Sequence, residues 1–317
     1  MAFYNPDPSM AQILASLVAA LERDGRPGLS KQLSITWLRY PDSLVQRAAN
    51  LDARGLVELP VRGASWGGER QRYPASVVKL VYLMAAEAWL QRQLLEDDEE
   101  LRRALADMIR DSSNDATGLV VDLLSGTTSG PSLPPERFGP WVRQRQLVNG
   151  WLASLGWPEL EGCNACQKTW GDGPYGRERD FYGQQLDNRN RLSTEASARL
   201  LHTVIAGAMV SPPASARMQE LLRRSLDPLQ READPENQVD GFLGAGLPNE
   251  ARLWSKAGWM SQARHDAAYV EVEGADPFLL VVFSEGTQAA GDEELLPLIA
   301  ARLLQSCHQA SGHRAGG

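Results

Sequence analysis

Residues Tyr73 to Trp89 read Tyr-Pro-Ala-Ser-Val-Val-Lys-Leu-Val-Tyr-Leu-Met-Ala-Ala-Glu-Ala-Trp. From Val77 onward this segment is apolar on nearly every face, which is typical of a helix buried on all sides. Ser76 stands directly before the apolar run, where a hydroxyl commonly accepts a hydrogen bond from a free N–H group of the first turn. The sequence therefore predicts a buried helix with Ser76 at its start, and capping alone would explain the serine.

Lys79 is harder to explain as part of a buried helix. It falls in the first turn, where its charge opposes the positive end of the helix dipole, and burial penalises the ammonium further. Both effects lower the pKa of the amine, and Ser76 lies one turn away. A partly neutral amine beside a hydroxyl can make serine a nucleophile, and the helix start would stabilise the oxyanion that follows attack. Ser-x-x-Lys is a short motif, so this hypothesis needs support from elsewhere in the chain.

Composition bounds the class of protein. The chain has 317 residues, 43% apolar and 23% charged, which suits one large or two modest globular domains. Its net charge of −8 argues against nucleic acid or an anionic membrane surface as the main partner. The sequence contains no apolar run of about 18 residues, so we expect no transmembrane helix. As written it also lacks a secretory signal, so we expect a cytoplasmic protein, with export of a longer precursor left open.

The cysteines and histidines predict no metal centre. The odd number of cysteines, three, fits a reducing compartment better than a disulfide framework. Cys163-Asn-Ala-Cys166 could be half of a zinc site or a redox pair, but no second pair and no nearby histidine completes it. Two ordinary loop cysteines are the favoured interpretation. We expect no metal, no cofactor and a monomer.

Hydrophobic periodicity divides the rest of the chain into helices and strands. The predicted helices cover residues 9–23, 96–110, 116–124, 141–155, 194–210, 214–226 and 292–307. The predicted strands cover residues 33–40, 56–61, 251–255, 267–272 and 278–284. Glycines predict a loop from Gly63 to Gly68 and a hairpin turn from Gly258 to Asp266.

This order of elements predicts an α/β (α+β) fold in which both termini build one antiparallel sheet flanked by helices. The sheet domain is expected to be discontinuous, with residues 1–75 and 236–309, and an all-helical insertion occupies residues 76–235. Residues 156–190 lack periodicity, and a loop of that length is usually functional or mobile. Residues 310–317 are expected to form a disordered tail.

Two further motifs support the hypothesis about Ser76. Ser112-Ser-Asn114 follows a predicted helix, and Lys256-Ala-Gly258 lies on a predicted strand beside a turn. Each has a simpler explanation: Ser112 could cap the next helix, and Lys256-Ala-Gly258 could be a strand end running into its turn. Three short signals in this order and in these settings are much less expected by chance.

Together the three motifs resemble those of the active-site serine β-lactamases and penicillin-binding proteins: Ser-x-x-Lys opening a helix, Ser-x-Asn in the helical domain and Lys-Thr-Gly on a strand. The closer likeness is to class A. Its Ser-Asp-Asn segment is similar to Asp111-Ser-Ser-Asn-Asp-Ala-Thr-Gly, and the helix after its omega loop is similar to residues 190–201. The resemblance covers roughly residues 30 to 305, and it implies a β-lactamase/transpeptidase-like fold.

The resemblance also implies roles for individual residues. Ser76 would be the acylated nucleophile, Lys79 its proton acceptor, and Ser112 the relay of a proton to the leaving nitrogen. Asn114 would hold the side-chain amide of the substrate. Lys256, in its motif with Gly258, would attract the substrate carboxylate. The N–H groups of Ser76 and Trp259 would form the oxyanion hole.

The chain departs from the family pattern in three places. Ala257 replaces the usual Thr or Ser, which removes a hydroxyl that helps to bind the carboxylate. Only 36 positions separate Ser76 from Ser112, fewer than in class A. The loop that should carry a deacylating glutamate has no Glu-x-x-Leu-Asn sequence. Glu159 falls too early, at the end of the preceding helix. Glu178 is the candidate base, and the alternative for it is a solvated charge cluster.

The expected function is therefore a serine hydrolase acting through an acyl-serine intermediate, with β-lactam hydrolysis favoured. A D-alanyl-D-alanine peptidase or esterase is the second hypothesis. A non-catalytic penicillin-binding or sensing module, which is acylated without turnover, is the third. The expected partner is a small-molecule β-lactam, peptide or ester substrate.

Overall fold

The computed structural model describes residues 3–48 and 61–311. Within these residues the strands form one seven-stranded sheet in the order β1-β3-β2-β7-β6-β5-β4. Only the β1–β3 pair is parallel, and the other pairs are antiparallel. The fold predicted from the sequence is therefore confirmed. The strands are β1 (Asn5–Pro6), β2 (Leu33–Arg39), β3 (Arg62–Trp66), β4 (Arg223–Arg224), β5 (Arg252–Met260), β6 (Ala263–Glu271) and β7 (Phe278–Glu285).

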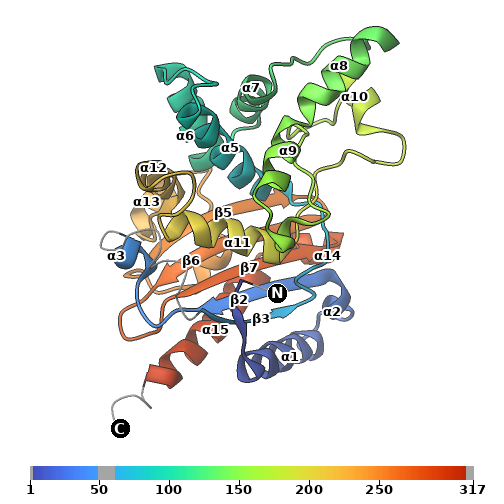
Figure 1. Ribbon diagram of the computed structural model, residues 1–317. Helices are drawn as coiled ribbons and strands as arrows, with labels where there is room; N and C mark the ends of the chain where they lie inside the picture. Colours follow the sequence, from blue (N-terminus) through green and yellow to red (C-terminus); the bar gives the residue numbers. More distant parts are fainter. Residues whose placement is uncertain (1–2, 49–60, 312–317) are drawn as a thin grey trace.

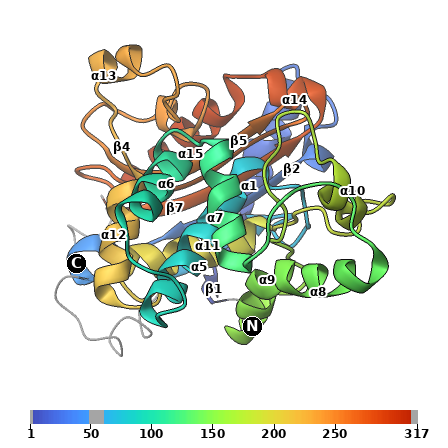
Figure 2. The same cartoon turned by 90° about the horizontal axis from the view of Figure 1, so that it is seen from above.

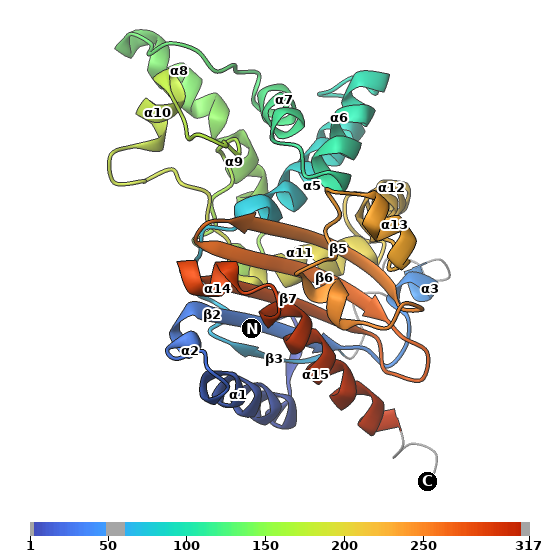
Figure 3. The same ribbon diagram turned by 180° about the vertical axis from the view of Figure 1, so that it is seen from behind.

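Helices cover both faces of this sheet (Figures 1 and 3). The described α-helices are α1 (Pro8–Arg23), α2 (Leu29–Gln32), α3 (Leu44–Ala48), α5 (Lys79–Gln91), α6 (Glu99–Arg110), α7 (Asn114–Ser125), α8 (Pro135–Arg145), α9 (Leu147–Ser154), α10 (Gly176–Tyr182), α11 (Thr194–Ile205), α12 (Pro212–Leu222), α13 (Pro228–Ala233), α14 (Thr287–Gly291) and α15 (Leu295–Ser311). Short 3₁₀ helices are η1 (Ala75–Val78), η2 (Pro158–Leu160) and η3 (Leu243–Gly246). No helix in residues 3–48 and 61–311 is long and apolar enough to cross a membrane.

The central strands separate two apolar cores because successive side chains of a strand point to opposite faces. On β2, Ile35 and Trp37 belong to the core beneath α1 and α15, whereas Leu38 belongs to the core beneath α5 and α11. β7 alternates in the same way, with Val282 on the first face and Val281 on the second. Burial on both faces explains why these strands read as nearly continuous apolar runs.

Helix α5 is the centre of the second core. All its residues from Lys79 to Trp89 are buried, and α6, α7 and α9 surround it (Figure 2). The buried helix predicted from the sequence is therefore confirmed. The short turn η1 that precedes α5 lies against β5, at the border between sheet and helices (Figure 3).

Several sequence-based element boundaries are wrong. Residues 63–68 were expected to be a loop, but β3 includes Gly63, which pairs with Leu38. A Cβ there would lie 2.4 Å from Leu38 Cδ2 and 3.0 Å from the Trp37 carbonyl oxygen, so the glycine allows β3 to pack closely against β2. The predicted turn at 258–266 is also wrong, since β5 continues to Met260 and β6 begins at Ala263. In addition, β4 comes from the segment expected to be helical.

Two further expectations concern segments at the edges of the described residues. Most of the strand expected at residues 56–61 lies outside the described residues. Helix α15 continues through Ser311, and the remainder of the expected tail lies outside the described residues.

Candidate active site

Ser76 lies in η1, directly before α5. Its hydroxyl caps neither helix, since neither η1 nor α5 has a side-chain cap, so the capping explanation is wrong. Side chains three positions apart nearly eclipse each other in a 3₁₀ turn, and the Lys79 N–H donates to the Ser76 carbonyl. The preceding residue, Ala75, has a φ of +46°, a costly backbone conformation for a residue with a Cβ. The chain therefore places Ser76 and Lys79 on one side of a strained turn.

The amine of Lys79 is enclosed by polar groups. It donates to the Ser112 carbonyl, to Ser112 Oγ at 3.1 Å and to Asn114 Oδ1 at 3.0 Å. Burial of the side chain lowers the pKa of Lys79 from 10.5 to about 7. The direction agrees with the expectation from the sequence, and desolvation is the cause. Burial therefore favours the neutral amine, which is the form able to accept a proton.

Ser112 and Asn114 come from the connection between α6 and α7. The cap of α7 is Ser113, whose hydroxyl accepts from the Ala116 N–H at 3.2 Å, so the capping explanation for Ser112 is wrong. Ser112 has a φ of +57°, which turns the chain sharply before the helix. Its hydroxyl lies between two amines, 3.1 Å from Lys79 Nζ and 3.0 Å from Lys256 Nζ.

Lys256 lies within β5, not at its end, so the explanation as a strand end is wrong. The side chain is fully buried, and burial, reinforced by the charges of Lys79 and Arg224, lowers its pKa well below the ordinary value. Two residues on, Gly258 lies against η1, and a Cβ there would be 2.8 Å from the Ser76 nitrogen. Glycine is therefore what allows β5 to approach the turn that carries Ser76.

A cleft of about 420 Å³ opens where these segments meet. Five of the eight predicted site residues line it: Ser76, Ser112, Asn114, Gly258 and Trp259. Lys79 and Lys256 lie behind this lining and reach it through Ser112. The Trp259 side chain is 58% exposed, and its indole N–H donates to the Ala290 carbonyl at 3.2 Å. Seven of the eight predicted residues therefore either line the cleft or are hydrogen-bonded to Ser112, which lines it.

Glu178 is the eighth residue, and it does not line this cleft. It is fully buried, so the alternative of a solvated charge is wrong. Its carboxylate pairs with Arg145 and accepts from the Ser129 hydroxyl at 2.8 Å. Ser129 accepts from Lys168 at 2.8 Å, and Lys168 and Arg145 both pair with Asp122. This ring of five side chains, here called the loop cluster, ties the loop before α10 and α10 itself to α7 and α8.

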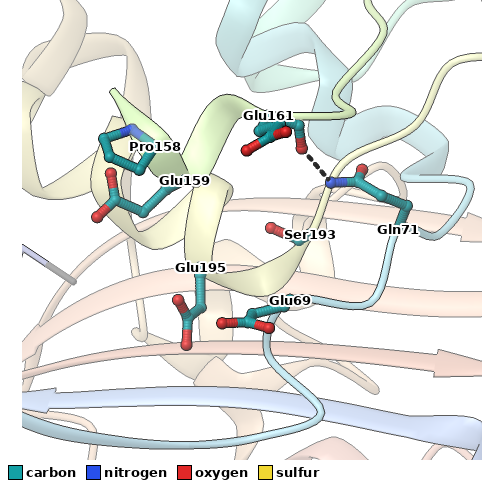
Figure 4. Close-up of a pocket in the computed structure, with 7 residues that line it drawn as sticks. All are labelled: Glu69, Gln71, Pro158, Glu159, Glu161, Ser193 and Glu195. Carbon is teal, nitrogen blue, oxygen red and sulfur yellow. Dashed lines mark hydrogen bonds between the residues drawn. The ribbon is translucent and has the colours of Figure 1, made fainter. Parts of the chain in front are cut away.

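A second pocket, on another part of the surface, is lined by four glutamates: Glu69, Glu159, Glu161 and Glu195 (Figure 4). None of the eight predicted residues lines it. Glu195 is held by the hydroxyls of Tyr4 and Ser65, and the Glu161 carbonyl accepts from Gln71. The position of Glu159 here agrees with its exclusion from the candidate site.

Polar groups that support the site had no local sequence motif that could have identified them. Gln238 donates to the carbonyls of Ile109 and Arg110, the last residues of α6, and Arg224 donates to the same two carbonyls. Helix ends leave such carbonyls without partners, so both side chains hold α6 and the loop after it in place. Arg224 also donates to the Ser255 carbonyl, which joins that loop to β5.

Asp266 lies opposite Ala257 in the register of β6 and β5. It is buried, accepts the Leu243 N–H at 3.1 Å, and has its pKa raised to about 7 by burial. The sequence was interpreted as a turn at this position, so Asp266 was not considered for the site.

Comparisons with known proteins identify the family of the chain and the fold that it shares. Residues 90–307 match the family model described as the beta-lactamase enzyme family, which covers more than half of the chain, including Ser112, Asn114 and Lys256 but not Ser76. No curated protein matches the sequence.

Solved structures similar to this one include three in which the match covers 96% of this chain and 98% of the other. They are PBP-A (16% identity, TM-score 0.61), a PBP-A mutant in an acyl-enzyme complex with penicillin-G (16%, 0.62) and a beta-lactamase from Sphaerobacter thermophilus DSM 20745 (17%, 0.62). At such low identity these structures show the shared fold alone.

Proposed function

Because this chain belongs to the beta-lactamase enzyme family, we propose that it is a serine hydrolase acting through an acyl intermediate on Ser76. The favoured substrate is a β-lactam amide. The observation that carries the proposal is the buried Lys79 amine, with a pKa of about 7, three positions from a serine whose hydroxyl caps no helix and lines the cleft.

The proposed acylation uses only groups of this chain. Neutral Lys79 accepts the Ser76 hydroxyl proton while Oγ attacks the substrate carbonyl carbon and forms a tetrahedral intermediate. The N–H groups of Ser76 and Trp259 stabilise the oxyanion. As the C–N bond breaks, the Ser112 hydroxyl gives its proton to the leaving nitrogen, and protonated Lys79 returns a proton to Ser112 across 3.1 Å. Asn114 orients the amide of the substrate side chain.

The proposal assigns Glu178 no part in hydrolysis of the acyl-enzyme. Its carboxylate is held by Arg145 and Ser129, and it lies outside the lining of the cleft. Because Glu178 is held away from the cleft and no other carboxylate is assigned the role of activating water, deacylation is expected to be slower than acylation.

Covalent labelling tests the proposal. A fluorescent penicillin, incubated at millimolar concentration for several hours, is expected to label the wild-type protein and not Ser76→Ala. Ser306→Ala, a serine on α15 remote from the cleft, is the matched control and should label like the wild type. Equal labelling of the wild type and Ser76→Ala would remove the proposal.

The placement of Glu178 favours a second candidate function, a penicillin-binding or sensing module that is acylated without turnover. Intact-mass spectra separate the two: an adduct that persists for hours favours the module, and rapid return of free protein favours the hydrolase. A peptidase or esterase activity is distinguished by comparing turnover of nitrocefin with that of a p-nitrophenyl ester.

A further inference from the structure

Gln238 occupies the position from which a substrate anion would reach Lys256. Its side chain lines the cleft yet is only 5% exposed. Its Oε1 accepts from Lys256 Nζ and from the Ala257 N–H at 3.3 Å. Its Nε2 donates to the carbonyls of Ile109 and Arg110. The oxygen and the nitrogen of the Gln238 amide are thus both hydrogen-bonded, and the oxygen contacts the Lys256 amine.

The Lys256 amine has no position left for a ligand. Besides Gln238 it contacts Ser112 Oγ at 3.0 Å and the Ala257 carbonyl at 2.7 Å. An ammonium makes three hydrogen bonds through its three donors. A neutral amine would make the same three contacts by accepting from the Ser112 hydroxyl. In addition, Ala257 lines the cleft beside Lys256 without a hydroxyl that could bind an anion.

The other charges of the cleft disfavour an anion as well. Among the described residues that line the cleft, Arg264 is the one cation, and it donates to main-chain carbonyls and pairs with Glu293. The lining contains four carboxylates: Asp111, Glu236, Asp240 and Glu293. Asp240 pairs with Arg231, whereas Asp111 and Glu236 are exposed, and Asp111 interacts with the charge of Arg224. A cleft of this charge concentrates cations and repels anions.

We propose that Gln238 determines specificity by taking the place of a substrate carboxylate on Lys256. The cleft accordingly favours amides or esters whose leaving group is neutral or cationic. Leaving groups that carry a carboxylate react slowly, and penicillins and nitrocefin belong to this slow class. This inference rests on the proposed function, since it concerns the substrate of the same Ser76 centre.

Three esters with one acyl group test it. Phenylacetylglycyl esters of phenol, of 3-(aminomethyl)phenol and of 3-hydroxybenzoate differ only in the leaving group, so they give the same acyl-enzyme and share one deacylation rate. The expected kcat/KM for the carboxylate ester is about tenfold below that of the neutral ester. The aminomethyl ester should equal or exceed the neutral one. A carboxylate ester that equals or exceeds either of the others would overturn the proposal.

Gln238→Met removes the acceptor oxygen and keeps a side chain of similar length. Because this change also removes the Nε2 donor to Ile109 and Arg110, the readout is a ratio: kcat/KM for the carboxylate ester divided by kcat/KM for the neutral ester is expected to rise about tenfold. Gln230→Met, on the exposed helix α13, is the matched control and should change none of the three. A folded Gln238→Met protein whose preference is unchanged would contradict the role of Gln238. If this variant does not fold, the comparison of the three esters on the wild type still decides the question.

Ser76→Ala separates this inference from the proposed function. If none of the esters shows turnover or labelling that depends on Ser76, the proposed function fails. If turnover depends on Ser76 but the carboxylate ester is preferred, only the substrate inference fails.

Discussion

Lys79 combines a buried side chain with an amine that reaches the Ser112 hydroxyl. Its pKa is lowered to about 7 because burial disfavours the charged form. The proposed chemistry requires the neutral amine, which predominates above this pKa. We therefore expect the acylation rate to rise about tenfold per pH unit below pH 7 and to level off above it. Stopped-flow labelling between pH 5 and 9 measures this, and a rate independent of pH would contradict the role of Lys79.

Lys79→Met removes the proton acceptor and keeps the apolar stem. Positioned bases contribute about a hundredfold to ten-thousandfold, so a loss of about a thousandfold in acylation rate is expected, with the fold intact by circular dichroism. Lys31→Met, at an exposed position outside the cleft, is the control. A variant that is acylated as fast as the wild type would exclude Lys79 as the base.

Ala257 offers a gain-of-function prediction. Its side chain lines the cleft beside Lys256, and a hydrogen bond to a charged group contributes about 1.5–3 kcal/mol. Ala257→Thr adds a hydroxyl there, so acylation by a carboxylated β-lactam is expected to rise about tenfold. Ala257→Val, which adds similar volume without a donor, should give no increase. The measurement is the second-order acylation rate, and an equal effect of both variants would attribute the change to volume alone.

Local motifs predicted the residue-scale features that depend on short spacing. Ser76 and Lys79 lie in one turn, and Ser112 and Asn114 lie in one connection between helices. Each pair falls within four consecutive positions, so a short motif identifies it. Gln238 could not be found in this way. Its importance comes from reaching α6 and β5 together, and no spacing within its own segment records those contacts.

Strand β5 depends on Gly258 for its approach to η1. A Cβ at this position would lie 2.8 Å from the Ser76 nitrogen and 3.0 Å from the Pro74 carbonyl oxygen. Gly258→Ala should therefore displace the turn that carries Ser76, and a displacement of about 1 Å can cost about a hundredfold in rate. The expected result is slow labelling with an unchanged far-ultraviolet spectrum. Gly274→Ala is unsuitable as a control because of its positive φ, whereas Gly150→Ala on α9 has open space around it. A Gly258→Ala protein that is labelled at the wild-type rate would show that this contact does not position Ser76.

The loop cluster makes a prediction about stability. Arg145 and Glu178 are both fully buried, and removing one partner of such a pair costs about 3–5 kcal/mol because the other charge stays buried and unpaired. Arg145→Met should lower the free energy of unfolding by about this amount, measured by urea denaturation. The double variant Arg145→Met, Glu178→Met is expected to be more stable than the single one. A double variant less stable than the single one would mean that the rest of the cluster, Asp122, Lys168 and Ser129, governs the cost.

At the scale of elements, apolar periodicity predicted α1, α5 and β7, because burial alone sets their pattern. It failed at β3 and at the end of β5, where Gly63 and Gly258 were interpreted as loop and turn residues. Both glycines instead permit close contact between backbones distant in the sequence. The loop cluster was also beyond prediction, since its members come from separate helices and loops.

The central sheet depends on pairing between a strand from the N-terminal part of the chain and a strand from the C-terminal part. Strand β2 pairs with β7 over seven residues, with Ile35 opposite Val282. Closing such a long chain segment costs entropy before the strands gain any contact, and folds rich in distant contacts fold slowly. Refolding from urea, measured by tryptophan fluorescence, is expected to take seconds or longer. Completion within milliseconds would contradict this prediction.

The candidate site draws on this architecture, because Ser76, Ser112 and Lys256 come from η1, the α6–α7 connection and β5. A partly folded chain would not bring these three side chains together. The chemistry proposed for Ser76 is thus available only to molecules that have completed folding. A covalent active-site titration would count native molecules directly, and so report the correctly folded fraction of any preparation.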